Sequence, residues 1–375
     1  MEPKESKAET AEASSTRTAS LPPSKEGREL QVRRPPKSYK NTSWLHSRSA
    51  REVRILCEYL EVRDRLRRQR VLATFLVFGT ARALSREQWS SRMAAASARL
   101  KQLTPGKDAP EDIEAAETEV KRITRLEWLC DYYDKVTKLT SKLAAWLLTP
   151  EARNAVGKIL KEIPTPIEHD DDWGQESVDK STPNGLCPVA VCTGGGPGLM
   201  EAANKGAAAV AGARSMGVGI SLPFEPGLNA YVADELSFEF HYFFTRKFWM
   251  VYSALAVIAA PGGVGTLDEL MEVLTLKQTK KMKRDIPVVL FGKKYWDDVI
   301  SFDKMVEYGT ISESDRDQLF VTDDEDEAFD FLRSCLVQDR LVLGNNYVHK
   351  SLRKRPREEA QPTPLCEQRS PNKCR

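Results

Sequence analysis

The segment PGGVGTLDEL, residues 261–270, places glycines suited to an anion site directly before two acidic residues. It follows an apolar run, SALAVIAA, and leads into a helical pattern, MEVLTLKQTKK. Gly262, Gly263 and Gly265 permit positive φ angles and let the backbone approach a ligand with no Cβ in the way. A helix that opens at Thr266 would offer its unpaired first amides and the positive end of its dipole. These features predict a phosphate-binding loop.

A second glycine loop repeats this design. In VCTGGGPGLMEAANKGA, an apolar strand pattern precedes four glycines and a helix that is predicted to start near Leu199. The four are Gly194, Gly195, Gly196 and Gly198. No GK[ST] follows, so the loop is not a P-loop, and Leu199 stands where GxGxxG has its third glycine. Glycines also form ordinary tight turns, but two such loops between a strand and a helix favour a nucleotide-sized anion.

The carboxylate of Glu269 has two interpretations. Thr266 and Glu269 fit the capping box [ST]xxE, in which the glutamate accepts a hydrogen bond from the threonine amide. A carboxylate within one turn of a phosphate site weakens phosphate binding, however, so its presence suggests a chemical use. The cations Arg246 and Lys247 lie upstream in FFTRKFWM. Arg246 is either a snorkelling surface residue or directed at the same rim, and spacing alone leaves both open.

Apolar and helical patterns alternate around these loops. The predicted strands are 71–79, 189–193, 216–222, 255–260, 286–292 and 319–324, and the helical patterns between or after them are 201–213, 241–255, 267–281 and 326–336. This alternation predicts an α/β, Rossmann-like fold with a mostly parallel sheet and helices on both faces. Ligands on such sheets bind beyond the carboxyl ends of the strands, where both glycine loops are expected.

Residues 46–349 are predicted to form this domain, with two excursions. One is a helical insertion at about 85–130, within a region whose residues 111–149 have the pattern of a long helix. The other is a polar loop at about 163–185, where three aspartates, Asp170 to Asp172, follow His169. Three consecutive carboxylates do not point to one centre, so we expect no metal site there.

The two ends, residues 1–45 and 350–375, are predicted to be disordered because they contain few large apolar side chains. The KRPR segment of the basic C-terminal tail is either a nuclear or nucleic-acid signal or, as we favour, a solvated tail.

Composition restricts the class of protein. The chain has 56 basic and 54 acidic residues, a net charge of +2, which argues against a nucleic-acid partner. Seven scattered cysteines without a CxxC pair indicate a reducing compartment and disfavour zinc. No apolar run approaches 18 residues, and the acidic N-terminal segment lacks a signal core. We therefore expect a cytoplasmic protein without a membrane partner, with a nuclear location through the C-terminal tail as the alternative.

Three blocks resemble the Lonely guy (LOG) family: GGGPGLMEAANKGA, the RK pair at 246–247, and PGGVGTLDE at 261–269. The last block fits PGGxGTxxE at all six fixed positions. Members of this family are cytokinin-activating nucleoside 5′-monophosphate phosphoribohydrolases that are often mislabelled lysine decarboxylases. The resemblance extends from about residue 71 to 335, apart from the two excursions.

The resemblance implies a Rossmann-like, usually homodimeric enzyme that hydrolyses the N-glycosidic bond of a nucleoside monophosphate to free base and ribose 5-phosphate. No metal or cofactor is required. Arg246 and Glu269 fall on the catalytic residues of the family. The remaining implied substrate-binding residues are the phosphate loop Gly262, Gly263, Gly265 and Thr266, the nucleotide loop Gly194, Gly195, Gly196 and Gly198, and Lys247.

The sequence leaves open both the identity of the substrate and the residue that donates a proton to the leaving base. A short plant-type enzyme would lack both excursions, so an ordinary purine or pyrimidine monophosphate is an alternative to a cytokinin nucleotide. Candidates for a general acid that protonates the base are Glu201, Asp234, Glu235 and Asp268.

Two other functions are compatible with such a fold. One is a non-catalytic nucleotide-binding or molybdenum-cofactor carrier protein, which the presence of Arg246 and Glu269 disfavours. Lysine decarboxylase ranks lowest, because that chemistry needs a lysine that holds pyridoxal phosphate and neither glycine loop contains a lysine.

Overall fold

The computed structural model describes residues 35–162, 167, 188–222, 227–282 and 284–338. The chain divides into two units, Met1–Arg51 and Glu52–Arg375. In the first unit, short helical segments occupy Ser38–Lys40 (η1), Thr42–Leu45 (α1) and Arg48–Ala50 (η2). The first two fall within the segment for which the sequence predicts disorder.

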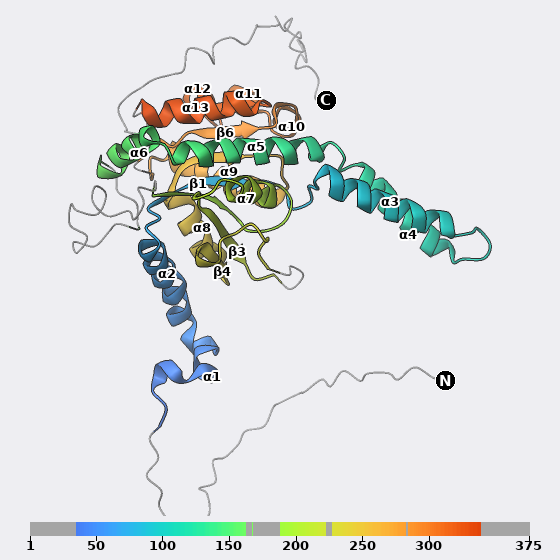
Figure 1. The fold of residues 1–375 in the computed structure, drawn as a ribbon, viewed down its shortest axis with the longest axis horizontal. Helices are drawn as coiled ribbons and strands as arrows, with labels where there is room; N and C mark the ends of the chain where they lie inside the picture. The colour runs from blue at the N-terminus through green and yellow to red at the C-terminus, as the bar shows by residue number, and fades with distance from the viewer. Residues whose placement is uncertain (1–34, 163–166, 168–187, 223–226, 283, 339–375) are drawn as a thin grey trace, which may run out of the picture. The chain divides into compact units, whose positions relative to one another are not determined.

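The second unit contains a seven-stranded, entirely parallel sheet (Figure 1). Its strands are β1 (Ala73–Phe78), β2 (Val189–Thr193), β3 (Ser215–Ile220), β4 (Ser237–Phe240), β5 (Ala254–Ala259), β6 (Val288–Phe291) and β7 (Leu319–Thr322). They are ordered β4-β3-β2-β1-β5-β6-β7. The chain winds outward in both directions from the neighbours β1 and β5, so the crevice typical of ligand sites lies at their carboxyl ends. This confirms the predicted α/β, Rossmann-like fold.

Strand β4 was missed by the sequence analysis. It has only four residues, and buried and more exposed positions alternate along it because it lies at the edge of the sheet. The central strands β2, β1, β5 and β6 are buried at every position. A continuous apolar run is therefore a strong signal for the central strands and a weak one for this edge.

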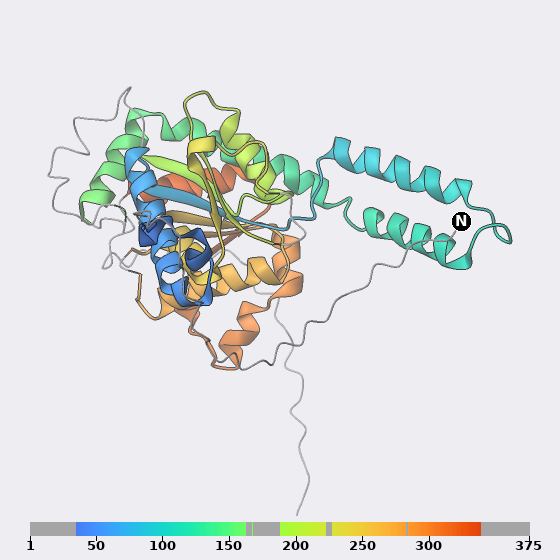
Figure 2. The ribbon, with the colours of Figure 1, turned by 90° about the horizontal axis from the view of Figure 1, so that it is seen from below.

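Helices cover both faces of the sheet (Figures 1 and 2). One face carries α5 (Leu129–Leu147), α6 (Pro150–Glu162), α7 (Leu199–Ala208) and α13 (Glu325–Val337). The other carries α2 (Arg51–Arg68), α8 (Phe243–Tyr252) and α9 (Val264–Gln278). Shorter helices are η4 (Asp234–Leu236), before β4, and α10 (Lys293–Val299), α11 (Phe302–Glu307) and α12 (Glu313–Asp317), between β6 and β7.

The single long helix predicted for residues 111–149 is wrong. The region contains α4 (Pro110–Thr124) and α5, separated by a turn at 125–128 that has neither glycine nor proline to mark it. Helix α4 pairs with α3 (Arg86–Gln102) to form a hairpin that extends away from the sheet (Figures 1 and 2). The indole of Trp89 donates to the Ile123 carbonyl between them, and a Ser85–Gln88 capping box starts α3.

Helices α5 and α7 pack closely because α7 has a glycine at their crossing. A Cβ added to Gly206 would lie 2.1 Å from Thr140 Oγ1 and 2.2 Å from the Thr137 carbonyl oxygen. The side chains of Leu139 and Ala203 are buried in the same layer.

We expect Gly206→Ala to destabilise the protein by about 1–3 kcal/mol, because the methyl group overpacks this crossing even though alanine favours a helix. Chemical denaturation measures the change, with Ala208→Ser at an exposed position of the same helix as the control. A Gly206→Ala protein at least as stable as the wild type would show that the two helices are not held this closely.

Candidate functional site

The two glycine loops meet at the carboxyl edge of the sheet through Thr80, which follows β1. The Thr80 amide donates to the Pro261 carbonyl at 2.9 Å, and its carbonyl accepts from the Leu199 amide at 3.0 Å. Gly198 is required here, because its φ is +74° and a Cβ would lie 2.3 Å from the Thr80 carbonyl oxygen. The loop after β1 therefore holds the other two loops side by side. No role for Thr80 was predicted from the sequence.

In the loop 261–266, the positive φ angles that the sequence predicted for the glycines are not found. Helix α9 begins at Val264, two residues before Thr266, and Gly263 is its N-cap with φ −87°. None of the three glycines, Gly262, Gly263 and Gly265, has a positive φ. A left-handed backbone is therefore not the reason for glycine at these positions.

The other predicted property of these glycines, the absence of a Cβ, is the one that matters here. A Cβ on Gly262 would lie 2.1 Å from Thr266 Oγ1, whereas Cβ atoms on Gly263 and Gly265 would meet nothing within 4 Å. The residue between those two glycines, Val264, is 84% exposed. The start of α9 thus presents bare backbone, as an anion site needs.

The capping-box interpretation of Thr266 and Glu269 is wrong. Helix α9 has no side-chain cap hydrogen bond, because it starts two residues too early for Thr266 to be its cap. Glu269 instead turns toward α8, and its Oε1 lies 3.3 Å from Nη1 of Arg246. Both side chains are largely buried, with exposed fractions of 14% and 10%.

Arg246 is not a snorkelling surface residue. Its Nε donates to the Val218 carbonyl within β3 at 2.8 Å, and the guanidinium passes over Gly194, where a Cβ would lie 2.5 Å from Nη2. Arg246 therefore spans the edge of the sheet from α8 to Glu269 on α9. The missing side chain of Gly194 makes room for it.

Lys247, the other predicted cation, faces α9 as well. Its Nζ lies 2.7 Å from Asp268 and 3.0 Å from Glu272. The two cations of α8 are thus matched by three carboxylates of α9. The predicted substrate-binding role of Lys247 stays a prediction, and in this structure the side chain is paired with acids.

Burial raises the pKa of Glu269 to about 7. The positive charges of Arg246 and Lys247 oppose this rise, whereas Asp268 and Glu272 add to it. Cys192 on β2 lies in the same electrostatic environment, and burial raises the pKa of its thiol to about 12, so it stays neutral beside the pair. Glu269 is consequently a carboxyl group that changes charge near neutral pH.

The loop 194–198 is fixed by a buried amide network. Gly195 has φ +73°, and its amide donates to Thr193 Oγ1 at 2.8 Å. Asn229 Nδ2 donates to the carbonyls of Gly195 and Gly196, each at 3.0 Å. Asn204, within α7, accepts from Thr193 and Asn229. Helix α7 starts at Leu199, as predicted.

These supporting residues were not predicted from the sequence. Gly196 lies against Met200, where its Cβ would be 2.8 Å from the Met200 methyl group. The available signal was Asn204, an asparagine inside the helix that follows the glycine loop. A buried side-chain amide needs hydrogen-bond partners, so its presence indicates a polar network around the loop.

The four candidate general acids lie in different places. Asp234 and Glu235 belong to η4, before β4, and therefore lie at the amino edge of the sheet, away from Glu269. Glu201 accepts from the Tyr133 hydroxyl at 2.9 Å, and Asp268 is paired with Lys247. The structure does not bring these four together.

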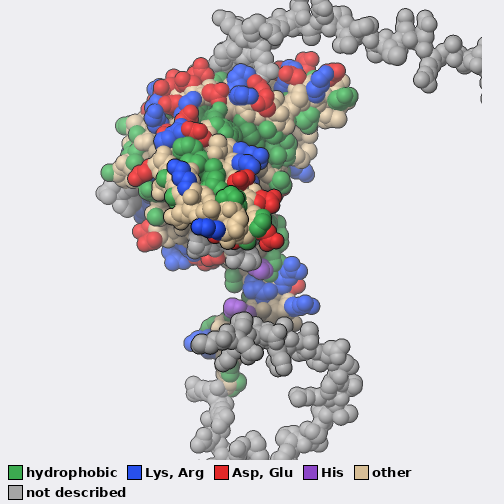
Figure 3. Space-filling view, turned by 90° about the vertical axis from the view of Figure 1, so that its right-hand side faces the viewer, with side chains coloured by type: hydrophobic (Ala, Val, Ile, Leu, Met, Phe, Trp, Pro, Cys, Tyr) green, Lys and Arg blue, Asp and Glu red, His purple; other side chains and the backbone are tan. Residues whose placement is uncertain are grey.

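No cluster of metal-ligating side chains occurs among the described residues. His169 and Asp170 to Asp172 lie outside them. No described helix is long and apolar enough to cross a membrane. Acidic and basic side chains are interspersed on the face of the molecule in Figure 3.

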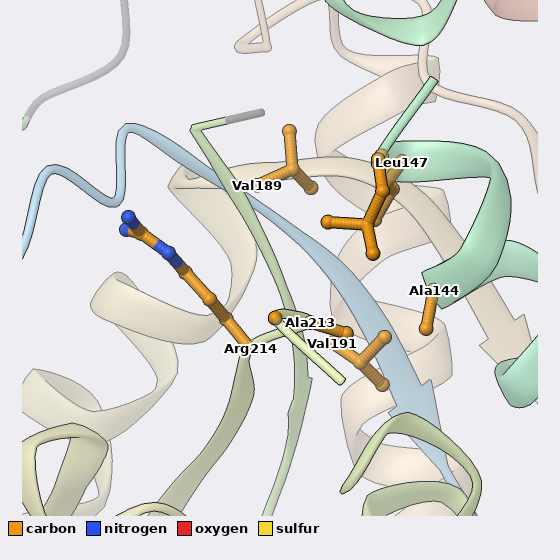
Figure 4. Close-up of a pocket in the computed structure, with 8 residues that line it drawn as sticks. Ala144, Leu147, Val189, Val191, Ala213 and Arg214 are labelled. Atoms are coloured by element: carbon orange, nitrogen blue, oxygen red, sulfur yellow. The ribbon is translucent and has the colours of Figure 1, made fainter. Parts of the chain in front are cut away.

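A small pocket lies away from this site, at the amino ends of β2 and β3 (Figure 4). Its lining is mostly apolar and consists of Ala144, Leu147, Leu148, Val189, Val191, Gly212, Ala213 and Arg214. The Arg214 side chain extends away from the apolar group, and its Nη1 donates to the Gln69 carbonyl. The lining of this pocket has no carboxylate like that of Glu269 and no helix start like that of α9, both of which lie at the carboxyl edge of the sheet.

A comparison with known protein families gives a match to this chain. Residues 200–332 match the family described as possible lysine decarboxylase, and this range contains the Arg246–Glu269 pair and the loop 261–266. The match supports the resemblance to the LOG family. A solved structure titled as that of TM1055, a structural genomics target, is 21% identical over 39% of this chain and 78% of its own. Its TM-score of 0.29 is too low to support an inference. No curated protein matches the chain.

The raised pKa of Glu269 predicts a pH-dependent change in stability. Because the folded pKa, about 7, exceeds the ordinary 4.5, this group stabilises the fold fully at low pH and loses that contribution as pH rises through 7. Relative to Glu269→Gln, the free energy of unfolding of the wild type should fall by on the order of 1–3 kcal/mol between about pH 5 and about pH 8.

Denaturation of both proteins across this range measures the difference. The control is Asp297→Asn, which removes an exposed carboxylate from an ion pair with Lys293. If the wild type and Glu269→Gln keep a constant difference at every pH, the carboxyl group does not titrate where its burial indicates.

Proposed function

We propose that this protein is a nucleoside 5′-monophosphate phosphoribohydrolase, which hydrolyses the N-glycosidic bond to give a free base and ribose 5-phosphate. The observation that carries the proposal is the buried ion pair of Arg246 with Glu269, 3.3 Å apart, next to the bare start of α9. The family match over residues 200–332 is additional support.

The position of Glu269 within α9 explains how phosphate and ribose would be handled together. The phosphate would bind the unpaired amides and positive dipole end at Gly263 to Thr266. Glu269 lies one turn further along the same helix, so a ribose attached to that phosphate would extend toward its carboxylate. Anchoring one end of the substrate would therefore orient C1′ at the other.

Cleavage of a ribosyl–base bond passes through an oxocarbenium-like state. An ionised Glu269 beside C1′ would stabilise the positive charge that develops and orient the attacking water. Its largely buried environment makes this interaction stronger than it would be in water.

Arg246 would favour the ionised form of Glu269, which the proposed chemistry requires. Burial favours the neutral form of Glu269, and the adjacent guanidinium favours the ionised form. Since Nε of Arg246 is held by the Val218 carbonyl, the cation stays in place between α8 and α9. The homodimer implied by the resemblance and the cytoplasmic location expected from the sequence remain predictions, and the choice of base stays open.

The first test is a panel of nucleoside 5′-monophosphates, including isopentenyladenosine monophosphate, assayed for release of the free base. We expect turnover of at least one of them, with an acidic limb in the pH dependence of kcat near 7 that reports ionisation of Glu269. Glu269→Gln should lower kcat at least about 100-fold, because the charge that stabilises the transition state is removed.

Asp297→Asn serves as the surface control for this assay and should retain wild-type turnover. If Glu269→Gln retains full activity, the assigned role of Glu269 is wrong. If the folded wild-type protein cleaves none of the panel yet binds a nucleotide, the non-catalytic binding protein becomes the better account.

The phosphate loop can be tested with two neighbouring glycines. Gly263→Ala should fold normally, because its φ is ordinary and nothing lies within 4 Å of the new Cβ, but the methyl group would crowd the bare loop and raise KM about tenfold or more. Gly262→Ala should destabilise the protein, since its Cβ would meet Thr266 at 2.1 Å.

Steady-state kinetics and thermal unfolding of the two variants distinguish these effects. The release of base from the matching nucleoside without phosphate provides a second control, because Gly263→Ala should leave that slow reaction unchanged. An unaltered KM for the monophosphate in Gly263→Ala would place the phosphate elsewhere.

A further inference from the structure

Helix α8 carries its two cations at an unfavourable position. Arg246 and Lys247 are the fourth and fifth residues of α8, and its first turn has no acidic residue. Positive charges near a helix N-terminus oppose the helix dipole, and the first amides have no partner within the helix. The N-cap residue, Tyr242, makes no side-chain cap hydrogen bond. The helix that positions Arg246 therefore needs an external anion at its start.

Helix α2 supplies that anion. Glu58 Oε1 accepts from the His241 amide at 2.8 Å, and Oε2 accepts from the Thr245 hydroxyl. One carboxylate thus holds His241, which precedes the N-cap Tyr242, and Thr245, which precedes Arg246. Glu58 is separated from these partners by more than 180 positions along the chain.

The rest of α2 is packed so that Glu58 is held at this place. Next to it, the Tyr59 ring lies 5.2 Å from Phe248 and 5.3 Å from Trp249, both in α8. Further along, the Arg65 guanidinium lies 4.4 Å from the Phe238 ring of β4. Helix α2 lies outside the residues that match the family, 200–332, and outside the resemblance that begins near residue 71.

We propose that Glu58 is a positioning residue for the proposed hydrolysis, acting from α2 by holding His241 and Thr245 at the start of α8 so that Arg246 stays against Glu269. It does not touch the reacting atoms. This inference rests on the proposed function for its effect on turnover, whereas its effect on the Arg246–Glu269 pair can be measured without turnover.

The test compares Glu58→Ala, Glu58→Gln and, as the matched control, Asp64→Ala in the full-length protein. Asp64 lies in the same helix in an exposed ion pair with Arg68, so the control removes the same charge from the same element. We expect Glu58→Ala to lower kcat about tenfold or more, with KM within about twofold, because the pair is loosened while the phosphate loop on α9 is unchanged. Glu58→Gln, which keeps an acceptor oxygen without the charge, should lie between, and Asp64→Ala should match the wild type.

The second readout is the titration of the Glu269 carboxyl group by carbon-13 NMR, assigned with Glu269→Gln. The charged or titratable groups that act on it are Arg246, Lys247, Asp268, Glu272 and Cys192. Loosening Arg246 removes the strongest attraction that favours the ionised form, so the pKa of Glu269 should rise in Glu58→Ala and not in Asp64→Ala.

A higher pKa of Glu269 together with the kcat-specific loss supports the proposal. If the wild type cleaves no monophosphate, the proposed function fails, but a raised pKa in Glu58→Ala still supports the positioning of Arg246 by Glu58. An unchanged pKa in a folded Glu58→Ala protein overturns the proposal, and so does a loss that appears in KM rather than in kcat.

Discussion

The ion pair of Arg246 with Glu269 is the interaction on which the arrangement of this edge of the sheet depends. Removing two charges from water is costly, and their attraction offsets that cost only when the geometry is good and further hydrogen bonds are made. The surroundings meet this requirement on the arginine side, where the Val218 carbonyl accepts from Nε and Gly194 leaves space for the guanidinium. On the glutamate side, burial is the largest influence, and it raises the pKa of the Glu269 carboxyl group to about 7.

Elements distant in the sequence converge on this pair and on the loop beside it. Thr80 ties the loop after β1 to both glycine loops, and Glu58 of α2 holds the start of α8. The base of the α3–α4 hairpin is connected as well, because Trp128 stacks at 5.8 Å on Tyr295, whose hydroxyl donates to the Gly262 carbonyl. The site is therefore built from more of the chain than the two motifs that reveal it.

The sequence predicted the fold well because buried parallel strands are continuous apolar runs, as in 254–259, and helices separate them. It located both glycine loops for the same reason, since each follows such a run. It failed where the answer depended on tertiary neighbours. The need for glycine at 194 comes from Arg246, and at 262 from Thr266, neither of which backbone conformation alone could reveal. The capping-box pattern at 266–269 was ambiguous until the start of α9 at Val264 was known.

The most direct test of the account is a crystal structure of the protein with ribose 5-phosphate, the expected product. We predict that its phosphate lies on the backbone amides between Gly262 and Thr266 and that its C1 hydroxyl lies within hydrogen-bond distance of Glu269, with Arg246 still against the carboxylate. A phosphate bound at another place, or a C1 directed away from Glu269, would contradict the central claim that this ion pair acts on the glycosidic carbon.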